Sequence, residues 1–181
     1  RVGIAMIGLE AITHLFAEGD PNARAYEALV RFLEVMGNHK PGAGDISIDP
    51  VGLSFQLKLL WLAGLAPHVD ECTACGSDSP VISFSAAHGG AVCKNCHDST
   101  STSVSDAALM GVRAMLKVPI AEAPEVVPPP GAAREILWMV REIQAHHGGF
   151  GDRGSGAVVK SSAIDDPLRQ RIPVTVDCRL T

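Results

Sequence analysis

Apolar residues recur at intervals of three and four in several stretches of the chain, and this spacing predicts helices. The first predicted helix covers residues 2–16 and ends at the Gly-Asp-Pro sequence of residues 19–21. Asp20 is expected to cap a second helix, with Pro21 in its first turn and Gly37 at its end. The inward-facing residues are predicted to be Val2, Met6, Leu9, Ile12 and Phe16 in the first helix, and Tyr26, Leu29, Val30, Leu33 and Met36 in the second.

A third helix is predicted over residues 50–65, after a loop rich in Gly and Pro at 38–44. Its apolar residues fall on two different faces. A helix that is apolar nearly all round is buried on both sides, so we expect this one at the centre of the fold. One face holds Leu53, Leu57, Leu60 and Gly64, and the other holds Phe55, Leu59 and Leu62.

The later part of the chain predicts two more helices and a small β-hairpin. Short strand-like runs at 81–84 and 91–92 lie within residues 70–98, and a Ser/Thr-rich linker follows at 99–105. One helix is expected at 106–117 with Asp106 as its cap, and the last at 134–147 after an extended proline-rich connection at 120–130. Their inward residues are predicted to be Leu109, Val112, Met115 and Leu116, and Ile136, Leu137, Val140 and Ile143.

These elements predict a mainly α fold, a helical bundle with an inserted short β-hairpin. Residues 1–69 and 99–150 are assigned to the helical domain, and residues 70–98 to the insertion. Residues 151–181 carry charges of both signs with little apolar periodicity, which predicts a disordered or loosely attached tail.

Composition narrows the class of protein. The 181 residues are 46% hydrophobic and 19% charged, which excludes a disordered polyampholyte. The formal net charge of -5 argues against binding nucleic acid by bulk electrostatics. The longest apolar run, at residues 53–66, is too short for a membrane span and includes Lys58. With no signal-peptide pattern at the start, we expect a soluble cytoplasmic protein and a fragment of a longer chain.

Four cysteines carry the clearest chemistry. Cys72 and Cys75 form one C-x-x-C pair, Cys93 and Cys96 form another, and 17 residues separate the pairs. Two such turns on a small hairpin can supply the four corners of a tetrahedral zinc site of the zinc-ribbon kind. Four thiolates leave no open coordination position, so the predicted zinc ion is structural. Gly76 follows the first pair, where a left-handed residue lets the turn close.

Other interpretations of the polar residues are weaker. Two disulfides or a redox dithiol are the alternatives for the four cysteines, but neither fits an intracellular chain with two C-x-x-C pairs on a hairpin and an unpaired Cys178. His68 and His97 flank the motif and are not needed as ligands. The pair His146 and His147, and the Gly-rich residues 148–156, match no metal or phosphate site. No catalytic constellation is evident, so we expect no enzyme.

The region from Gly52 to Cys96 resembles the bacterial recombination mediator family RecO. The family pattern is a helix ending in Leu-x-Gly-φ-x-Pro (φ is apolar), then C-x-x-C-G, Phe-Ser and Gly-Gly-φ-x-C-x-x-C. Here these are residues 62–67, 72–76, 84–85 and 89–96. The resemblance extends over residues 1–150. The family's N-terminal OB-fold has no counterpart in this chain, and residues 151–181 match nothing in the family.

The resemblance implies a non-enzymatic, nucleoid-associated DNA-repair protein that anneals single strands and loads recombinase past single-strand-binding protein. It also implies a RecR-type mediator partner, and a helical pocket for the acidic, Phe-ended tail of single-strand-binding protein. The alternative is a zinc-ribbon interaction module of another assembly. An OB-type barrel encoded upstream would favour the mediator.

Charge distribution suggests where partners bind. Residues 1–150 hold 10 Lys/Arg and 16 Asp/Glu, a formal -6 with scattered cations, so we expect weak, salt-sensitive binding to single-stranded DNA. Arg113, Lys117, Arg134 and Arg141 on the last two helices are candidates for gripping the acidic tail. The alternative is that they are ordinary solvated charges, paired with residues such as Glu135 and Glu142.

Overall fold

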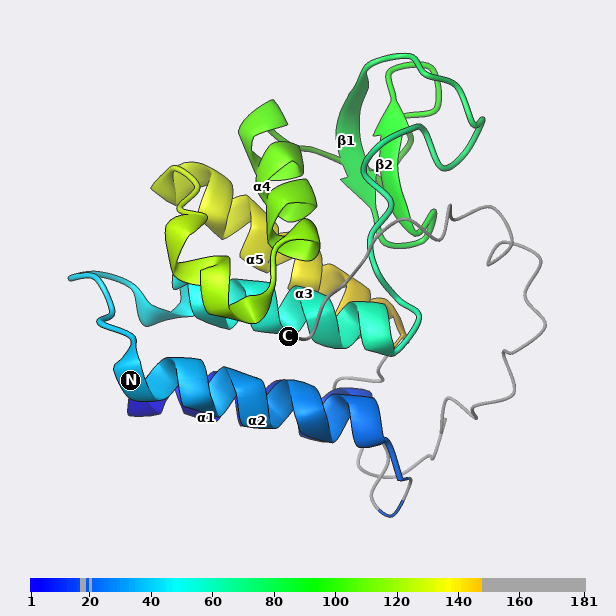
Figure 1. The fold of residues 1–181 in the computed structure, drawn as a ribbon. Helices are drawn as coiled ribbons and strands as arrows, with labels where there is room; N and C mark the ends of the chain where they lie inside the picture. Colours follow the sequence, from blue (N-terminus) through cyan, green and yellow to red (C-terminus); the bar gives the residue numbers. More distant parts are fainter. Residues whose placement is uncertain (17–18, 20, 148–181) are drawn as a thin grey trace.

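The computed structural model describes residues 1–16, 19 and 21–147. The fold is mainly helical with one small antiparallel sheet, as predicted (Figure 1). In chain order the elements are α1 (Val2–Leu15), α2 (Ala23–Asn38), the 3-10 turn η1 (Ile46–Ile48), α3 (Pro50–Leu62), β1 (Val81–Ser85), β2 (Gly90–Cys93), β3 (Thr102–Ser103), α4 (Asp106–Lys117), the 3-10 turn η2 (Ile120–Glu125) and α5 (Pro130–His147).

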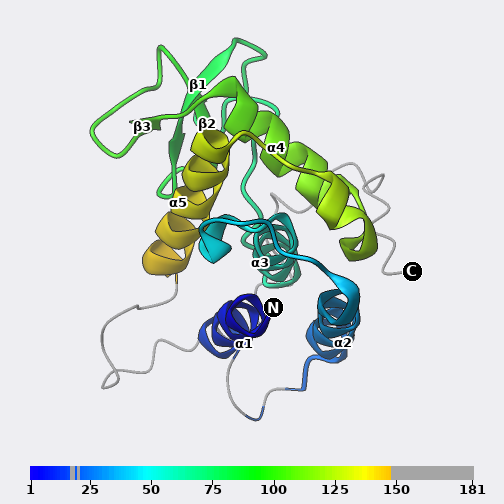
Figure 2. The same ribbon diagram turned by 90° about the vertical axis from the view of Figure 1, so that its left-hand side faces the viewer.

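Helix α3 is the central element, as its apolar pattern predicts. Every residue from 51 to 60 is buried. Seen nearly end-on in Figure 2, α3 lies between the α1–α2 pair and the α4–α5 pair. The Asp49 side chain caps its first turn by accepting hydrogen bonds from the N–H groups of Val51 and Gly52, and a buried His39 ring lies 2.7 Å from the same carboxylate.

The two predicted faces of α3 belong to two separate hydrophobic clusters. Phe55 and Leu59 pack with α1 and α2, where the Phe55 ring stacks on Phe32 at a centroid distance of 4.0 Å. Leu53, Leu57 and Leu60 pack with α4, α5 and the inserted sheet. The inward residues predicted for α4 and α5 belong to this second cluster, with Leu116 only partly buried.

The predicted inward faces of α1 and α2 are largely wrong. In α1 the buried residues are Ile4, Gly8 and Ala11, while Val2 and Met6 are exposed. A Cβ atom at Gly8 would lie 2.5 Å from the Phe32 ring, so close approach of the helices favours small residues on this face. In α2 the buried residues are Ala25, Ala28, Phe32 and Met36; Leu29 is partly buried, and Tyr26, Val30 and Leu33 are exposed.

Several boundaries and caps also differ from the prediction. Asn22 caps α2 by accepting from the N–H of Ala25, and Ser105, not Asp106, caps α4 by accepting from Ala108. Helix α5 starts at Pro130, because proline suits the first turn of a helix. The connection expected to be extended contains η2, and the Ser/Thr linker contributes β3.

The inserted sheet has the strand order β2-β1-β3. Strands β1 and β2 are antiparallel, with Phe84 opposite Ala91 and Ser85 opposite Gly90, which confirms the hairpin. Phe84 is fully buried and its ring meets Trp138 of α5 edge-on, with centroids 6.0 Å apart. The sheet therefore shares its core with the helices.

In the described part of the chain, no helix is both long enough and apolar enough to cross a membrane. The predicted tail at 151–181, the Gly-rich stretch at 148–156 and Cys178 lie outside the described residues, and so does Asp20.

Candidate metal centre and helical cleft

The first cysteine pair is positioned by the segment that leaves α3. After a left-handed Gly64, this segment runs beside β2, where the carbonyl of His68 accepts a 2.7 Å hydrogen bond from the N–H of Ala91. The chain then turns at the first pair, and the N–H of Gly76 donates to the carbonyl of Cys72 at 2.7 Å. Gly76 has a φ of +65°, which confirms the left-handed residue expected there.

The second pair continues directly from β2. Cys93 is the last residue of this strand, and the N–H of Cys96 donates to the Cys93 carbonyl at 3.1 Å to close the turn. The N–H of Cys93 also donates to the Sγ atom of Cys72 at 3.3 Å. The two turns are thus joined by a hydrogen bond of the kind that stabilises a thiolate.

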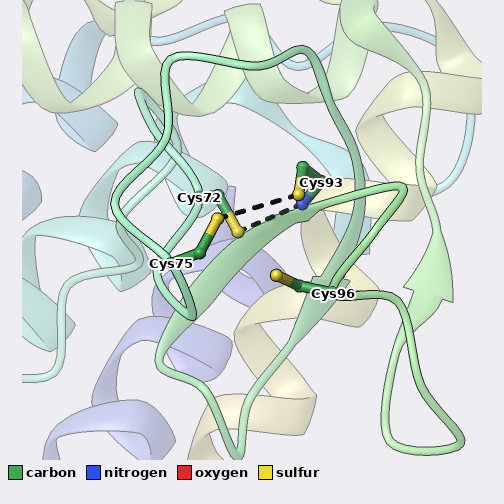
Figure 3. A group of neighbouring side chains, drawn as sticks. All are labelled: Cys72, Cys75, Cys93 and Cys96. Atoms are coloured by element: carbon green, nitrogen blue, oxygen red, sulfur yellow. Dashed lines mark hydrogen bonds between the residues drawn. The ribbon is translucent and has the colours of Figure 1, made fainter.

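The four sulfur atoms converge on one small space (Figure 3). The Sγ atoms of Cys72, Cys75, Cys93 and Cys96 all lie within 4.8 Å of one another, and those of Cys75 and Cys93 are 3.9 Å apart. A tetrahedral zinc ion with Zn–S bonds of about 2.3 Å requires sulfurs about 3.8 Å apart. The donor set and its spacing therefore fit a zinc ion.

The electrostatics of the cluster also suit a cation. Burial raises the pKa of the Cys72 thiol, but hydrogen bonds from the backbone of Cys93, Cys75 and Ala74 outweigh it and lower the pKa to about 6. Hydrogen bonds with Cys75 and Cys93 raise the pKa of Cys96 to about 12. Closely packed thiols resist ionising together, and a divalent cation among them removes that resistance.

The alternatives for the cysteines receive no support from the geometry. All four are free thiols, and they form one compact group rather than two bonded pairs. The flanking histidines are outside this group. The ring of His97 is hydrogen-bonded to the Ser83 hydroxyl at 3.0 Å, while His68 is exposed on the segment before the first turn.

One clasp of the insertion was not predicted. The Asp98 carboxylate lies 3.0 Å from the His88 ring and accepts hydrogen bonds from Thr100 and Ser101. These hydrogen bonds hold the pKa of Asp98 well below its usual value, and the bond from the Thr100 side chain contributes most. The clasp ties the loop after Cys96 to the β1–β2 turn. Single polar residues ten positions apart give no periodic or spaced pattern that would reveal it.

An open cleft of about 390 Å³ lies between α1, α3, η1 and α5. Ile7, Ala11 and Leu137 supply apolar walls, and Arg141 supplies a cation. The carboxylates of Glu10 and Glu142 and the imidazole of His14 also line the cleft. Glu10 and His14, both on α1, form a 3.7 Å pair. The resemblance implied a helical pocket, but the residues that line this cleft were not predicted, since its walls come from four elements far apart in the sequence.

The four basic residues singled out in the sequence occupy different places. Arg113 is already engaged: its Nε donates to the Asp70 carboxylate at 2.6 Å, and its guanidinium also donates to the Val69 carbonyl. Lys117 is exposed in the last turn of α4. Arg134 and Arg141 are exposed on α5, and neither forms an ion pair with a residue in the described ranges 1–16, 19 and 21–147.

The pairing of these arginines with Glu135 and Glu142, given above as the alternative, is absent from that described part of the chain. Glu135 instead accepts a 2.6 Å hydrogen bond from the N–H of Ser105, which fixes the start of α4 to α5. Within the described residues both α5 arginines therefore remain available on the surface, and Arg141 lines the cleft.

Comparison with known proteins identifies the family. Residues 1–155 match the family model described as "Recombination protein O C terminal". The chain belongs to this RecO C-terminal family. A DNA repair protein RecO from Rubrobacter xylanophilus is 33% identical over 124 residues, which cover 66% of this chain and 48% of that protein. The DNA repair protein RecO of Myxococcus xanthus is 29% identical over 146 residues, covering 79% of this chain and 55% of that protein.

A third RecO protein, from Alkaliphilus metalliredigens, is 32% identical over 105 residues, which cover 58% of this chain and 41% of that protein. The chain thus spans about half the length of the RecO relatives it matches. The family match confirms the resemblance drawn from the cysteine turns and the segment before them, and it corrects the expected boundary at residue 150, because the match extends to residue 155.

Proposed function

We propose that this chain is the helical and zinc-binding part of a non-enzymatic DNA-repair protein that mediates recombination. The match of residues 1–155 to the RecO C-terminal family is the observation that carries the proposal. The mediator role consists of annealing single strands and helping recombinase load onto DNA coated with single-strand-binding protein. Such a protein would act in the cytoplasm at the nucleoid, together with a RecR-type partner.

The metal is proposed to be one structural zinc ion held by Cys72, Cys75, Cys93 and Cys96. Support comes from the convergence of the four Sγ atoms within 4.8 Å. With four thiolate ligands the coordination sphere is closed, so the metal would stabilise the turns and offer no position for a substrate.

Elemental analysis tests the zinc site. Protein purified without chelator should contain about one zinc per chain, and Cys93→Ser should lose it. Cys178→Ser, a cysteine outside the motif, is the matched control and should retain the metal. A folded protein with four reduced thiols and no bound metal would contradict the proposal.

DNA binding by this part alone is proposed to be weak. Residues 1–150 have a formal charge of -6, and a zinc ion with four thiolates adds about two negative charges. Counterion release requires clustered cations, and those of the described chain are scattered over different elements. Fluorescence anisotropy with labelled single-stranded DNA should detect only salt-sensitive binding. Sub-micromolar affinity at physiological salt would refute this.

The partner surface is proposed to be the cleft together with Arg134 and Arg141. An acidic peptide ending in an aromatic residue needs an apolar slot beside one or two cations. The apolar cleft walls and the two unpaired α5 arginines supply these parts. The tail of single-strand-binding protein has this chemistry. Arg113 is less suited because it already holds Asp70, and Lys117 lies in the last turn of α4, away from the residues that line the cleft.

Titration of a labelled tail peptide tests the surface. Arg134→Ala/Arg141→Ala should weaken binding at least about tenfold, since each charge-assisted bond contributes about 1.5–3 kcal/mol. Arg24→Ala/Arg31→Ala on α2 removes the same number of charges elsewhere and should bind as the wild type does. Equal affinity for all three proteins would remove α5 from the proposal.

A further inference from the structure

The loop before α3 carries a carboxylate to the edge of the cleft. Ser47, in η1, lines the cleft together with Arg141. Asp45 caps η1, accepting hydrogen bonds from the N–H of Ser47 at 2.9 Å and from its hydroxyl. Because η1 packs against α5, as Figure 2 shows, its exposed N-cap residue Asp45 is held near the arginine-bearing helix.

Asp45 is charged and interacts with both arginines. The hydrogen bonds from Ser47 lower its pKa, and the guanidinium groups of Arg134 and Arg141 lower it further. No ion pair within 4.0 Å forms between Asp45 and a residue of the described ranges. The interaction is therefore a through-space attraction, and it leaves the donors of both arginines available to another acceptor.

We propose that Asp45 is a specificity-determining residue of this surface, which weakens the binding of anionic partners by offsetting the positive potential of Arg134 and Arg141. The proposal rests on the function proposed above. A carboxylate of the partner that approaches the arginines also approaches Asp45, and the like charges repel. Only a partner with several carboxylates, or with an apolar group that fills the cleft, would overcome this repulsion.

The substitution Asp45→Asn removes the negative charge of this side chain and keeps its size and its hydrogen-bond acceptor. Asparagine is as good an N-cap as aspartate, so η1 should keep its hydrogen bond from the Ser47 N–H. Asp78→Asn is the matched control, because it makes the same chemical change at an exposed position of the insertion. Both variants change the net charge by the same amount, so a difference between them reports position.

The experiment is a titration of a labelled acidic, Phe-ended peptide at two salt concentrations. Asp45→Asn should bind about two- to fivefold more tightly than wild type at low salt, with a smaller gain at high salt. Asp78→Asn should bind like the wild type. The gain should disappear when Asp45→Asn is combined with Arg134→Ala/Arg141→Ala.

Three results would overturn the inference. Equal affinity of Asp45→Asn and wild type, while the double arginine variant binds weakly, would refute the role of Asp45 and leave the partner surface intact. An equal gain in Asp78→Asn would show an effect of net charge. Failure of every variant, wild type included, to bind the peptide would refute the partner surface and with it the inference.

Discussion

Replacing Phe84 with alanine should destabilise the helices as well as the inserted sheet. The Phe84 side chain comes from β1, yet it is fully buried in the same cluster as Leu53 and Leu57 of α3. Its ring meets Trp138 of α5 at an interplanar angle of 82°. The substitution thus removes an aromatic ring from the junction between the sheet and two helices.

The magnitude follows from this burial. Removing a fully buried Phe side chain costs about 3–5 kcal/mol, through lost transfer free energy and the cavity left behind. Of this, about 0.5–1.5 kcal/mol is the edge-to-face contact with Trp138. Ile82 provides a control in the same strand, because its side chain is 39% exposed. Ile82→Ala should lower the free energy of unfolding by less than about 1 kcal/mol.

Urea denaturation followed by far-UV circular dichroism measures the helices directly, and tryptophan fluorescence reports on the surroundings of Trp138 and Trp61 together. Both signals should shift to lower urea in Phe84→Ala, with coincident midpoints. The milder Phe84→Leu serves if the alanine variant does not fold. A helical transition that is unchanged in both variants would refute the idea of a shared core.

Three further predictions follow from individual contacts. Removing zinc with a chelator should lower the urea midpoint of the helical transition, because the sheet shares the helical core. If the chelator makes the cysteine thiols more reactive but leaves that midpoint unchanged, the prediction is wrong. Gly8→Val should cost about 1–3 kcal/mol in unfolding free energy, since its Cβ would lie 2.5 Å from Phe32, whereas Gly37→Ala meets nothing within 4 Å and should be neutral or stabilising. Lys58→Met should cost about 1–3 kcal/mol, because buried Lys58 donates a 2.6 Å hydrogen bond to the Val118 carbonyl beyond the end of α4; an unchanged denaturation midpoint would refute it.

Some elements were predictable because their determinants are local. The apolar residues on both sides of α3 predicted burial on two faces, and these faces enter two different clusters. The C-x-x-C spacing predicted which cysteines would converge, since each pair needs only a tight turn and the hairpin joins the pairs. Gly76 was predictable for the same reason, as the turn requires a left-handed residue.

The faces of α1 and α2 were not predictable from hydrophobicity. Each helix has two candidate stripes with large apolar residues on both, and the exposed stripe includes Met6 in α1 and Leu33 in α2. The buried stripes contain Gly8 and Ala28, which rank low in hydrophobicity. Their selection depends on the bulky Phe32 and Phe55 rings, which fill the space between the helices and require small neighbours.

We expect the inserted unit to need both a bound metal and the helices to hold its shape. Its separate cluster of buried residues consists only of Cys72, Val92 and Cys93, which is too small to offset the conformational entropy of about 29 ordered residues. On one side, a zinc ion bound to the four sulfurs would supply the missing free energy. On the other side, Phe84 joins the helical core, and Arg113 of α4 holds Asp70 at the base of the insertion. The metal would therefore fold the turns, while these two contacts orient them on the helices. Loss of the metal should weaken the packing of Phe84, and loss of Phe84 should weaken the metal site, because Phe84 of β1 and Cys93 of β2 lie on paired strands.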